Sequence, residues 1–491
     1  MTTLNKITQF GIKVNVGIIA LTIFSASAAQ TMMASADTAL SFKQAINLAQ
    51  KNDPWLTGNI HQQKALESMS VAVGTLPDPT VSIGLANLPT NGFDFGQEGM
   101  TQAKVGITQM FPRGETLKFK SQQLKLQSEM FPQQRLDRES KVAVTVGSLW
   151  LDAYQVQQSI ALIERNKALF EQLADIAKAS YSSAVGKTRQ QDIVRAQLEL
   201  TRLEERLDKL GQQKNRFEGM LLQWLTQISD DNGATEDVSL AAKFSLHNIL
   251  LSEELPKIAL INHQLVYQEN WLQSNDLVPY FAKHPAVVAI DKKVKATKTG
   301  ITLAKQKYQP QWGVNASYGY RADDPMGNSR ADLFSVGVSF DLPIFTENRQ
   351  DKEVQSAIST TEAVKTEKLL LLRKFISAYA SSKGRLQRLK SRQQLYKSKL
   401  LPQMYDHVDA ALTGYTHDDG DFTEVVRSRI AVLNAEIDDL ALNVEEQKIL
   451  LELNYLLIGS IDTPISKNKI DVINNGEYVT TFDAVNFGEE K

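Results

Sequence analysis

Cysteine is absent from all 491 residues of the chain. Its absence excludes disulfides, thiolate metal sites, cysteine nucleophiles and a lipid attached to an N-terminal cysteine. A strong excess of charge is missing too, because 54 Lys and Arg residues balance 56 Asp and Glu residues, which leaves a net charge of −2. A surface for binding polyanions is therefore not indicated.

Patterns of catalytic or metal-binding residues are equally scarce. The six histidines form no HxxxH or HExxH pair, and the sequence contains no glycine-rich phosphate loop. We therefore predict that the protein is not an enzyme and has neither a cofactor nor a metal site.

Long apolar runs are missing beyond the first residues. Lys6 and Lys13 precede VGIIALTIF at residues 16–24, and the small residues ASA occur twice, at 26–28 and 34–36. This pattern is typical of a secretory signal peptide, because the run is shorter than the roughly 20 residues of a membrane-spanning helix. We predict a signal peptide at 1–36, cleaved after about residue 28 or 36.

One feature that is present is a long internal repeat. VGITQMFP at 105–112 matches VGVSFDLP at 336–343, and at the same offset Pro54 aligns with Pro285 and Pro79 with Pro310. Duplication on this scale predicts two similar structural units. The predicted divisions are a first repeat at 37–227, a belt or linker segment at 228–282, a second repeat at 283–460 and a polar tail at 461–491.

Each repeat contains two short stretches with a two-residue period. In WGVNASYGY and LFSVGVSF, apolar residues alternate with Gly, Ser and Asn, and the first repeat has a weaker version around Val81–Leu85 and Val105–Ile107. A soluble sheet would give a similar alternation, but a small, uncharged second face favours a transmembrane barrel. The aromatic residues toward the strand ends would form a membrane girdle: Trp312, Tyr318, Tyr320, Phe334 and Phe340. Four strands are too few to close a barrel in lipid, so we expect several chains to share one.

Each strand pair is followed by a very long helical stretch. Residues 113–181 and 346–413 contain proline only at Pro132 and Pro402, and each stretch would be about 100 Å long. We expect the two prolines to kink the helices at a similar level. The returning segments have apolar residues at coiled-coil spacing: Leu200, Leu203, Leu207 and Leu210 in the first, and Val426, Ile430, Leu433, Ile437, Leu440 and Val444 in the second.

The two predicted hairpin tips are the most informative polar sites. VGKTRQQDIVRA at 185–196 turns at Gly186, and YTHDDGDFTEVV at 415–426 turns at Gly420. Helix capping explains much of the second tip, because Asp421 and Glu424 have the spacing of a capping box. A functional role for these acids does not exclude capping.

The sequence resembles the outer-membrane factor family, the TolC-like exit ducts of efflux and type I secretion systems. The motifs LPDPTVSIGLANLP at 76–89 and GMTQAKVGITQMFPRGETL at 99–117 are similar to its heavy-metal branch, the CusC- and CzcC-like proteins. The chain departs from the pattern at the strand exit, where many relatives have Pro-x-x-Gly-Lys and this sequence has Pro112-Arg113-Gly114-Glu115, and at Phe422, where TolC has a gate arginine.

The resemblance implies a trimer with a twelve-strand β-barrel in the outer membrane and a helical barrel in the periplasm. It also implies a periplasmic adaptor and an inner-membrane, RND-type transporter as partners. The implied gate or cation ring comprises Asp192, Tyr415, Asp418, Asp419, Asp421, Glu424 and Arg427. The implied adaptor-docking residues are Val185, Gly186, Lys187 and Gly420.

Other functions have to be weighed against a heavy-metal exit duct. A multidrug or type I secretion duct would share the architecture and differ in cargo. A periplasmic adaptor would have one helical hairpin and no barrel strands, and a soluble coiled-coil scaffold would need neither the strands nor a signal peptide. The duplicated hairpins and the aromatic-edged strands favour the duct.

Overall fold

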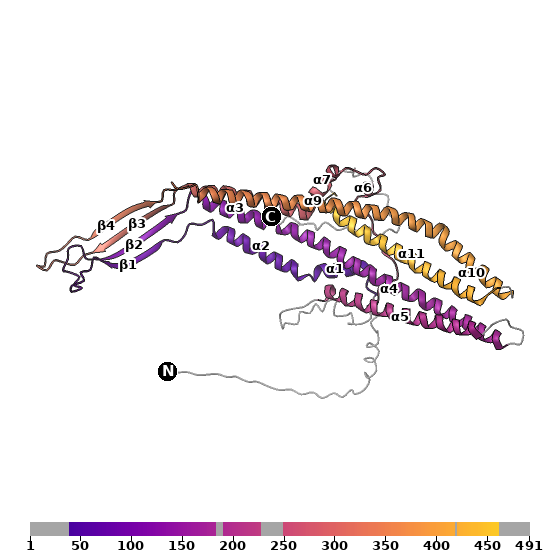
Figure 1. The fold of residues 1–491 in the computed structure, drawn as a ribbon. Coiled ribbons are helices and arrows are strands. Elements are labelled where there is room, and N and C mark those ends of the chain that lie inside the picture. The colour runs from indigo at the N-terminus through magenta and orange to yellow at the C-terminus, as the bar shows by residue number, and fades with distance from the viewer. Residues whose placement is uncertain (1–38, 183–189, 227–248, 418–419, 461–491) are drawn as a thin grey trace, which may run out of the picture. The chain divides into compact units, whose positions relative to one another are not determined.

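The computed structural model describes residues 39–182, 190–226, 249–417 and 420–460. All its helices and strands belong to one compact unit that begins at Leu40 (Figure 1). In chain order they are α1 (Phe42–Lys51), α2 (Pro54–Ala72), β1 (Thr80–Ala86), β2 (Gln102–Phe111), α3 (Thr116–Ser128), α4 (Phe131–Ser182), α5 (Gln190–Leu225), α6 (His263–Tyr267), α7 (Ser274–Ala282), α8 (Pro285–Lys305), η2 (Gln306–Tyr308), β3 (Trp312–Tyr320), β4 (Leu333–Phe340), α9 (Gln350–Leu395), η3 (Tyr396–Leu400), α10 (Leu401–Thr416), α11 (Phe422–Leu457) and η4 (Ile458–Ser460).

The four strands form one antiparallel sheet in the order β1-β2-β3-β4. Gly106 at the centre of β2 lies opposite Ser82 of β1 and Ser317 of β3, and Ala316 of β3 lies opposite Val336 of β4. The β2–β3 pair joins the two halves of the chain. The outer edges of the sheet are the free sides of β1 and β4.

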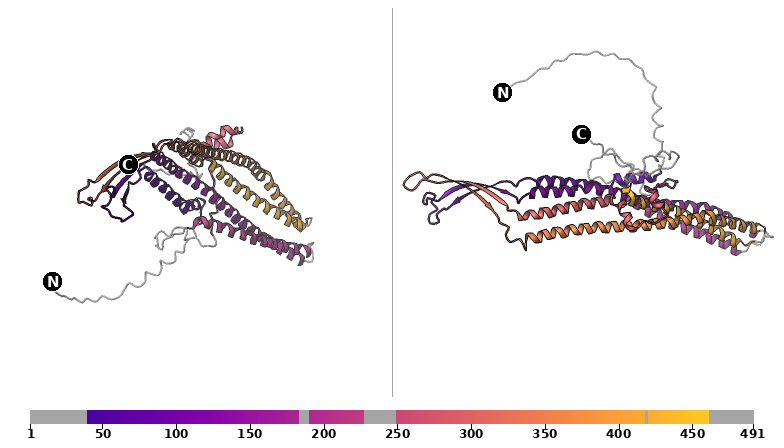
Figure 2. Two further views of the ribbon diagram at one scale, coloured as in Figure 1. Left: turned by 60° about the vertical axis from the view of Figure 1, so that its left-hand side comes forward. Right: turned by 90° about the horizontal axis from the view of Figure 1, so that it is seen from above.

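The helices next to the sheet repeat the order of the strands. α2 leads into β1, β2 leads into α3, α8 leads into β3, and β4 leads into α9. α2 packs against α3, α3 against α8, and α8 against α9, so these helices lie side by side in the same sequence as the strands (Figure 2, right). The strand pairing is therefore continued by helix packing.

The two repeats begin their first long helix with different caps. The Asp53 carboxylate accepts a hydrogen bond from the Trp55 amide (3.1 Å) and pairs with Arg138 (2.7 Å). At the matching position of the second repeat, the fully buried His284 accepts a hydrogen bond from the Ala286 amide (3.1 Å) at Nδ1. Both residues precede a proline in the first helical turn, where a missing N–H costs little.

The predicted long helical stretches form, each with one interruption near its proline. The first breaks between α3 and α4, just before Pro132, and the second contains the π-helix η3 just before Pro402. The expectation that the prolines act at a similar level was wrong. Pro132 lies early in its stretch, close to the sheet, whereas Pro402 lies late, close to the hairpin tip. A proline disrupts the helical turn that precedes it, so the interruption of each helix lies wherever that helix has its own proline.

The returning helices bury the apolar positions that the sequence predicted. α5 packs on α4 and α11 packs on α10, α9 and α4. Leu203, Val426 and Leu433 belong to one core cluster with Ile163 and Phe170 of α4, and the remaining spaced residues from Leu200 to Ile437 pack on its edge. The two hairpins of the chain therefore share one core near their tips.

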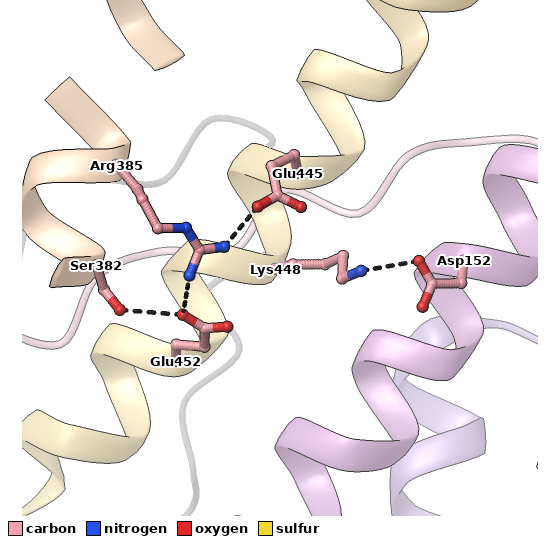
Figure 3. Close-up of polar contacts among 6 residues, drawn as sticks. All are labelled: Asp152, Ser382, Arg385, Glu445, Lys448 and Glu452. Atoms are coloured by element: carbon pink, nitrogen blue, oxygen red, sulfur yellow. Dashed lines mark hydrogen bonds and ion pairs between the residues drawn. The ribbon is translucent and has the colours of Figure 1, made fainter. Parts of the chain in front are cut away.

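Ion pairs hold α11 between α9 and α4 (Figure 3). Arg385 of α9 contacts Glu445 and Glu452 of α11, the second at 3.0 Å. On the other side of α11, Lys448 donates to Asp152 of α4 at 2.8 Å. All the pairs are at least partly exposed, so the apolar residues of the same interface contribute more of its stability.

The described part of the predicted belt, residues 249–282, lies against the helices at the level of α1. The Ile258 and Ile261 amides donate to the side chains of Gln447 and Asn454 of α11, each at 2.8 Å. Lys383 of α9, which is buried, donates to the carbonyl oxygen of Gln268 (3.1 Å), and burial lowers its pKa. These contacts satisfy backbone groups of a segment that has little regular structure of its own.

Within the described ranges, none of the helices combines the length and the apolar character that a membrane-crossing helix requires.

Candidate functional site

One face of the sheet is apolar and exposed in all four strands. The period-two alternation places every second side chain on the same side, and the strand register then lines these side chains up in rows. Ile83 lies opposite Val105, Val105 opposite Tyr318, and Tyr318 opposite Phe334. We call this the apolar sheet face; its large exposed members are Val81, Ile83, Leu85, Val105, Ile107, Phe111, Trp312, Val314, Tyr318, Tyr320, Phe334, Val336, Val338 and Phe340.

The exposure of these residues is much higher than a soluble sheet would show. Ile83 is 82 % exposed and Val336 is 64 % exposed, although both lie near the middle of their strands. A contiguous apolar surface of this kind marks a protein interface or a membrane surface.

The five predicted girdle aromatics all lie on the apolar sheet face, in two groups. Trp312 is paired with Phe340 at the helix-proximal end, with ring centroids 4.7 Å apart. Tyr318 is paired with Phe334 toward the other end, and Tyr320 stacks on Phe95. From Trp312 to Tyr320 a strand extends about 26 Å.

The opposite face of the sheet carries mainly small and polar residues, and its apolar exceptions are Met110 and Leu333. Gly106 faces Ser82 and Ser317, and a Cβ added to Gly106 would lie 2.9 Å from Ser82 Oγ. A Cβ added to Gly337 would lie 2.4 Å from the amide oxygen of Asn315. The longer polar side chains therefore lie over neighbouring glycines. We call this the polar sheet face; it also contains Lys104 of β2.

The Arg113-Gly114-Glu115 segment forms the junction between sheet and helices. Arg113 forms an ion pair with Asp341 and donates to the carbonyl oxygen of Gln309 (2.8 Å), so it links the two repeats. Gly114 has a φ of +46°, and a Cβ there would lie 2.4 Å from Gln306 Oε1. The positive φ favours glycine at this turn, whereas the Gln306 side chain could move aside.

At the second hairpin tip, Asp421 is the N-cap of α11, as the capping interpretation predicted. Its carboxylate accepts a hydrogen bond from the Thr423 amide at 3.1 Å. Glu424, the expected second member of the capping box, instead pairs with Arg427 at 2.9 Å and lies 3.5 Å from His407 Nε2.

Gly420 is required at the same tip because the backbones approach closely. Its amide donates to the carbonyl oxygen of Gly414 at 2.9 Å, and an added Cβ would lie 2.5 Å from the Tyr415 backbone nitrogen. The tip is therefore a tight connection between α10 and α11.

The other predicted tip residues divide into two groups. Asp192 is only 5 % exposed at the start of α5, so in the single chain it is not presented on the surface as Glu424 is. Val185, Gly186, Lys187, Asp418 and Asp419 lie outside the described residues.

Phe422 is 1 % exposed and packs edge-on against Tyr415 of the same hairpin, with ring centroids 5.6 Å apart. It belongs to the core cluster that contains Ile163 and Phe170 of α4, so it contributes to the apolar contact between the two hairpins. Beside it, Arg195 of α5 donates to the Thr423 hydroxyl, and deeper in the hairpins Arg206 donates to Asn434 (2.7 Å). Neither arginine contact was predicted from the sequence. In both contacts the two partners are separated by the same number of residues along the chain.

No group of three or more His, Cys, Asp or Glu side chains in the described ranges is arranged to hold a metal ion. Of the acids at the second tip that the structure describes, Asp421 serves as the cap of α11 and Glu424 takes part in ion pairs.

Comparison with known proteins gives matches in structure alone. No family profile matches the sequence, and no curated protein sequence matches it either. Several solved structures match over most of the chain. They include the outer-membrane channel OprN, with 12 % identity, a TM-score of 0.65, and coverage of 85 % of this chain and 90 % of that one.

Two further structures show the same likeness. CusC, described as forming a transmembrane channel, has 14 % identity and a TM-score of 0.65, with 86 % of this chain and 92 % of that chain covered. The Campylobacter jejuni outer-membrane channel CmeC has 12 % identity, a TM-score of 0.63, and 85 % of both chains covered. At such low identity the likeness establishes the fold, and the chain therefore has the fold of these channel proteins.

Proposed function

We propose that the protein is a member of the outer-membrane factor family and forms a trimeric channel. The observation that carries the proposal is the apolar sheet face on an open four-stranded sheet. In lipid, the free sides of β1 and β4 would leave backbone groups unpaired, so β1 of one copy pairs with β4 of the next. Three copies close a barrel of twelve strands, and the family's fold has this form.

The dimensions of the sheet support its placement in a membrane. The aromatic groups at Trp312 and Tyr320 are about 26 Å apart along the strand, close to the roughly 25 Å height of the apolar band of outer-membrane barrels. In this arrangement the apolar sheet face contacts lipid and the polar sheet face lines the water-filled lumen. The helices extend into the periplasm.

Cross-linking tests the proposed closure directly, because the chain has no cysteine of its own. We expect Ser82→Cys on β1, combined in turn with Ser335→Cys and Ser339→Cys on β4, to give disulfide-linked trimers in outer membranes for at least one pair. A matched control combines Ser82→Cys with Ser317→Cys on β3, which lies inside the sheet and is not an edge. Cross-linking in the control alone, or a stable monomer in detergent-free buffer, would contradict the trimeric barrel.

We propose further that the channel is the passive exit duct of a tripartite efflux system, without catalytic activity. An inner-membrane, RND-type transporter and a periplasmic adaptor would deliver the cargo. The hairpin tips support this role because they lie at the end of the helices farthest from the sheet. Val185, Gly186, Lys187 and Gly420 would dock the adaptor, whereas Asp192, Asp418, Asp419, Asp421, Glu424 and Arg427 would surround the periplasmic opening with Tyr415.

The proposed gate combines an apolar contact with a ring of acids. Phe422 and Tyr415 hold the second hairpin against the first, and three copies of Asp421 and Glu424 near one axis would attract cations. Replacing both acids by Asn and Gln should lower the cation preference of single channels in planar bilayers while the trimer remains intact. Unchanged ion preference would mean that both acids serve the helix start and its ion pairs alone.

We propose heavy-metal cations as the cargo, on the similarity of the motifs at 76–89 and 99–117 to the heavy-metal branch. Deleting the gene should then increase sensitivity to copper or silver, or to cobalt, zinc and cadmium. Normal metal tolerance with increased sensitivity to dyes or drugs would assign the duct to multidrug export.

A further inference from the structure

The two repeats of the chain meet at a polar junction where the sheet passes into the helices. Arg113 follows β2, and its guanidinium donates to the carbonyl oxygen of Gln309, which precedes β3, at 2.8 Å. Arg113 also forms an ion pair with Asp341, which follows β4. Gly114 lies beside the Gln309 side chain, because a Cβ added to the glycine would lie 3.1 Å from Gln309 Cγ. We call these four residues the internal junction.

Because the chain is duplicated, the residues of the internal junction have counterparts toward the outer edges of the sheet. The motif at 105–112 and its copy at 336–343 correspond position by position, and the alignment continues through the two residues after each motif. The corresponding pairs are Met110 with Asp341, Arg113 with Ile344, and Gly114 with Phe345. Ile344 and Phe345 thus follow β4, which is an edge strand.

The counterpart of Gln309 follows from the register of the strands. Val81 of β1 and Val314 of β3 each pair with the third residue of the motif in their own repeat. β1 and β3 therefore match at these two valines, and five residues earlier Leu76 matches Gln309. The ends of α2 and α8 match in the same alignment. The register shifts this part of the repeat by two residues from the sequence alignment, because α8 has 21 residues and α2 has 19.

The counterparts of the internal junction are all apolar, and each is at least one-third exposed. Ile344 is 68 % exposed, Phe345 86 %, Leu76 52 % and Met110 38 %. Ile344 and Phe345 lie at one edge of the sheet, and Leu76 lies at the other edge, before β1. The arginine, the aspartate and the glutamine of the internal junction have therefore been replaced together. Exposed apolar residues on both edges indicate surfaces that another molecule covers.

We propose that Ile344 and Phe345 of one copy pack against Leu76 and Met110 of the adjacent copy. The inference rests on the proposed function, because the pairing of β4 with β1 of the next copy brings these residues together. The arrangement repeats the internal junction: β1 and β2 of the next copy lie beside β4 as β3 and β4 lie beside β2. The contact is head-to-tail, so in a closed ring of three copies it occurs three times.

The two kinds of junction are not interchangeable. If Arg113 lay against Leu76 and Met110, its guanidinium would lose the carboxylate that it has in the internal junction, and a charge without its partner is costly to bury. An apolar side chain such as Ile344 has no such requirement. Polar and apolar junctions would therefore alternate around the barrel, and the apolar ones would mark the boundaries between copies.

Cross-linking tests whether Ile344 lies beside a second copy, because the chain has no cysteine of its own. In the full-length protein, Ile344→Cys/Leu76→Cys should give disulfide-linked trimers in outer membranes after mild oxidation. The matched control uses the internal counterpart of Leu76, as Ile344→Cys/Gln309→Cys, and should give at least tenfold fewer links between chains. Equal yields of the two variants, or no links between chains with Leu76→Cys, overturn the proposal.

Charge substitutions distinguish a second copy from lipid as the neighbour of Ile344. Sedimentation in density-matched detergent measures the protein concentration at which half of the chains are trimers. Ile344→Asp should raise this concentration at least tenfold. The control Asn348→Asp, which adds the same charge at an exposed position of the same segment, should change it less than twofold.

A second substitution should restore the trimer. Ile344→Asp/Leu76→Lys should return the concentration to within threefold of that of the parent, because opposite charges then meet across the boundary between copies. A double variant no better than Ile344→Asp would mean that the two side chains contact lipid, which overturns the proposal. An effect of Ile344→Asp no larger than that of Asn348→Asp overturns it as well.

The cross-links between Ser82→Cys on β1 and the cysteines on β4 separate this contact from the proposed function. If those links form while Ile344→Cys/Leu76→Cys stays unlinked, the trimeric barrel stands and the apolar contact between copies is wrong. If neither combination is linked between chains, the barrel is overturned and the contact with it.

Discussion

The apolar sheet face can be tested by one pair of neighbouring substitutions in β4. Val336 is the fourth residue of the strand, lies on the apolar sheet face and is 64 % exposed. Ser335 precedes it and lies on the polar sheet face, opposite Ser317. We consider Val336→Lys and Ser335→Lys, which add the same charge to the same strand on opposite faces.

The expected difference is large if the apolar sheet face contacts lipid. A lysine on the lipid face near the bilayer midplane costs about 2–4 kcal/mol. At about 1.4 kcal/mol per factor of ten, this corresponds to a ~30- to ~700-fold change in the folding equilibrium of each chain. The Ser335 variant should cost about 0.5 kcal/mol or less, because the polar sheet face already contains Lys104, opposite Gly319.

The assay is urea unfolding of each variant folded into lipid vesicles, monitored by tryptophan fluorescence and by the loss of heat-resistant oligomers in electrophoresis. The predicted order of stability is parent and Ser335→Lys together, followed by Val336→Lys. Equal stability of the two lysine variants would refute lipid contact of the apolar sheet face. Greater loss from Ser335→Lys would reverse the assignment of the two faces.

Three further changes should act at sites away from the sheet. Gly420→Val should destabilise the second tip by about 1–3 kcal/mol, because a Cβ would lie 2.5 Å from the Tyr415 backbone nitrogen; unchanged resistance of the tip to limited proteolysis would contradict this. Burial lowers the pKa of His284 from 6.5 to about 4, so the unfolded chain takes up a proton first and about 3 kcal/mol of stability should be lost as the pH falls from 6.5 to 4. That loss should be missing from pH-dependent unfolding of His284→Asn, which keeps a capping residue and cannot titrate there. Lys448→Met should cost about 1–2 kcal/mol by leaving Asp152 without its ion-pair partner, and Lys448→Met/Asp152→Asn should recover part of the melting temperature; a double variant no better than the single one would mean that the pair contributes little.

Sequence periodicity predicted the strands and helices in which each face has the same surroundings from one end of the element to the other. In β3 and β4 the alternation of apolar and small residues was sufficient, because strand geometry alone sends Val336 and Ser335 to opposite faces. In α11 the three- and four-residue spacing of Val426 and Leu433 was sufficient for the same reason. The fold of duplicated strands and long hairpins therefore followed from patterns within single segments.

Contacts between segments could not be predicted in the same way. Arg113 looked like a departure from a motif, yet it pairs with Asp341 of the other repeat. Phe422 looked like the loss of a gate arginine, and the structure shows it buried between two hairpins. Such roles depend on the lateral packing and axial stagger of helices far apart in sequence, for which one sequence contains no direct signal.

For a related reason, the sequence predicted the role of some residues of the candidate site and not of others. Asp421 acts on its own helix, so capping statistics were enough to find it. Glu424 was expected to bond back to the same helix start, but it pairs instead with Arg427 of its own helix. His407 lies near it only because α10 and α11 are side by side. The buried position of Asp192 depends on packing in the same way.

The pairing of β2 with β3 takes place within one polypeptide, and this determines how its rate of formation depends on protein concentration. Nine residue pairs, from Ala103 with Tyr320 to Phe111 with Trp312, join the two halves of one polypeptide. This seam forms in a first-order reaction whose rate does not depend on protein concentration. In the trimer proposed above, the outer edges, β1 and β4, would pair with other molecules, so dilution would slow their encounter and leave the central seam unaffected.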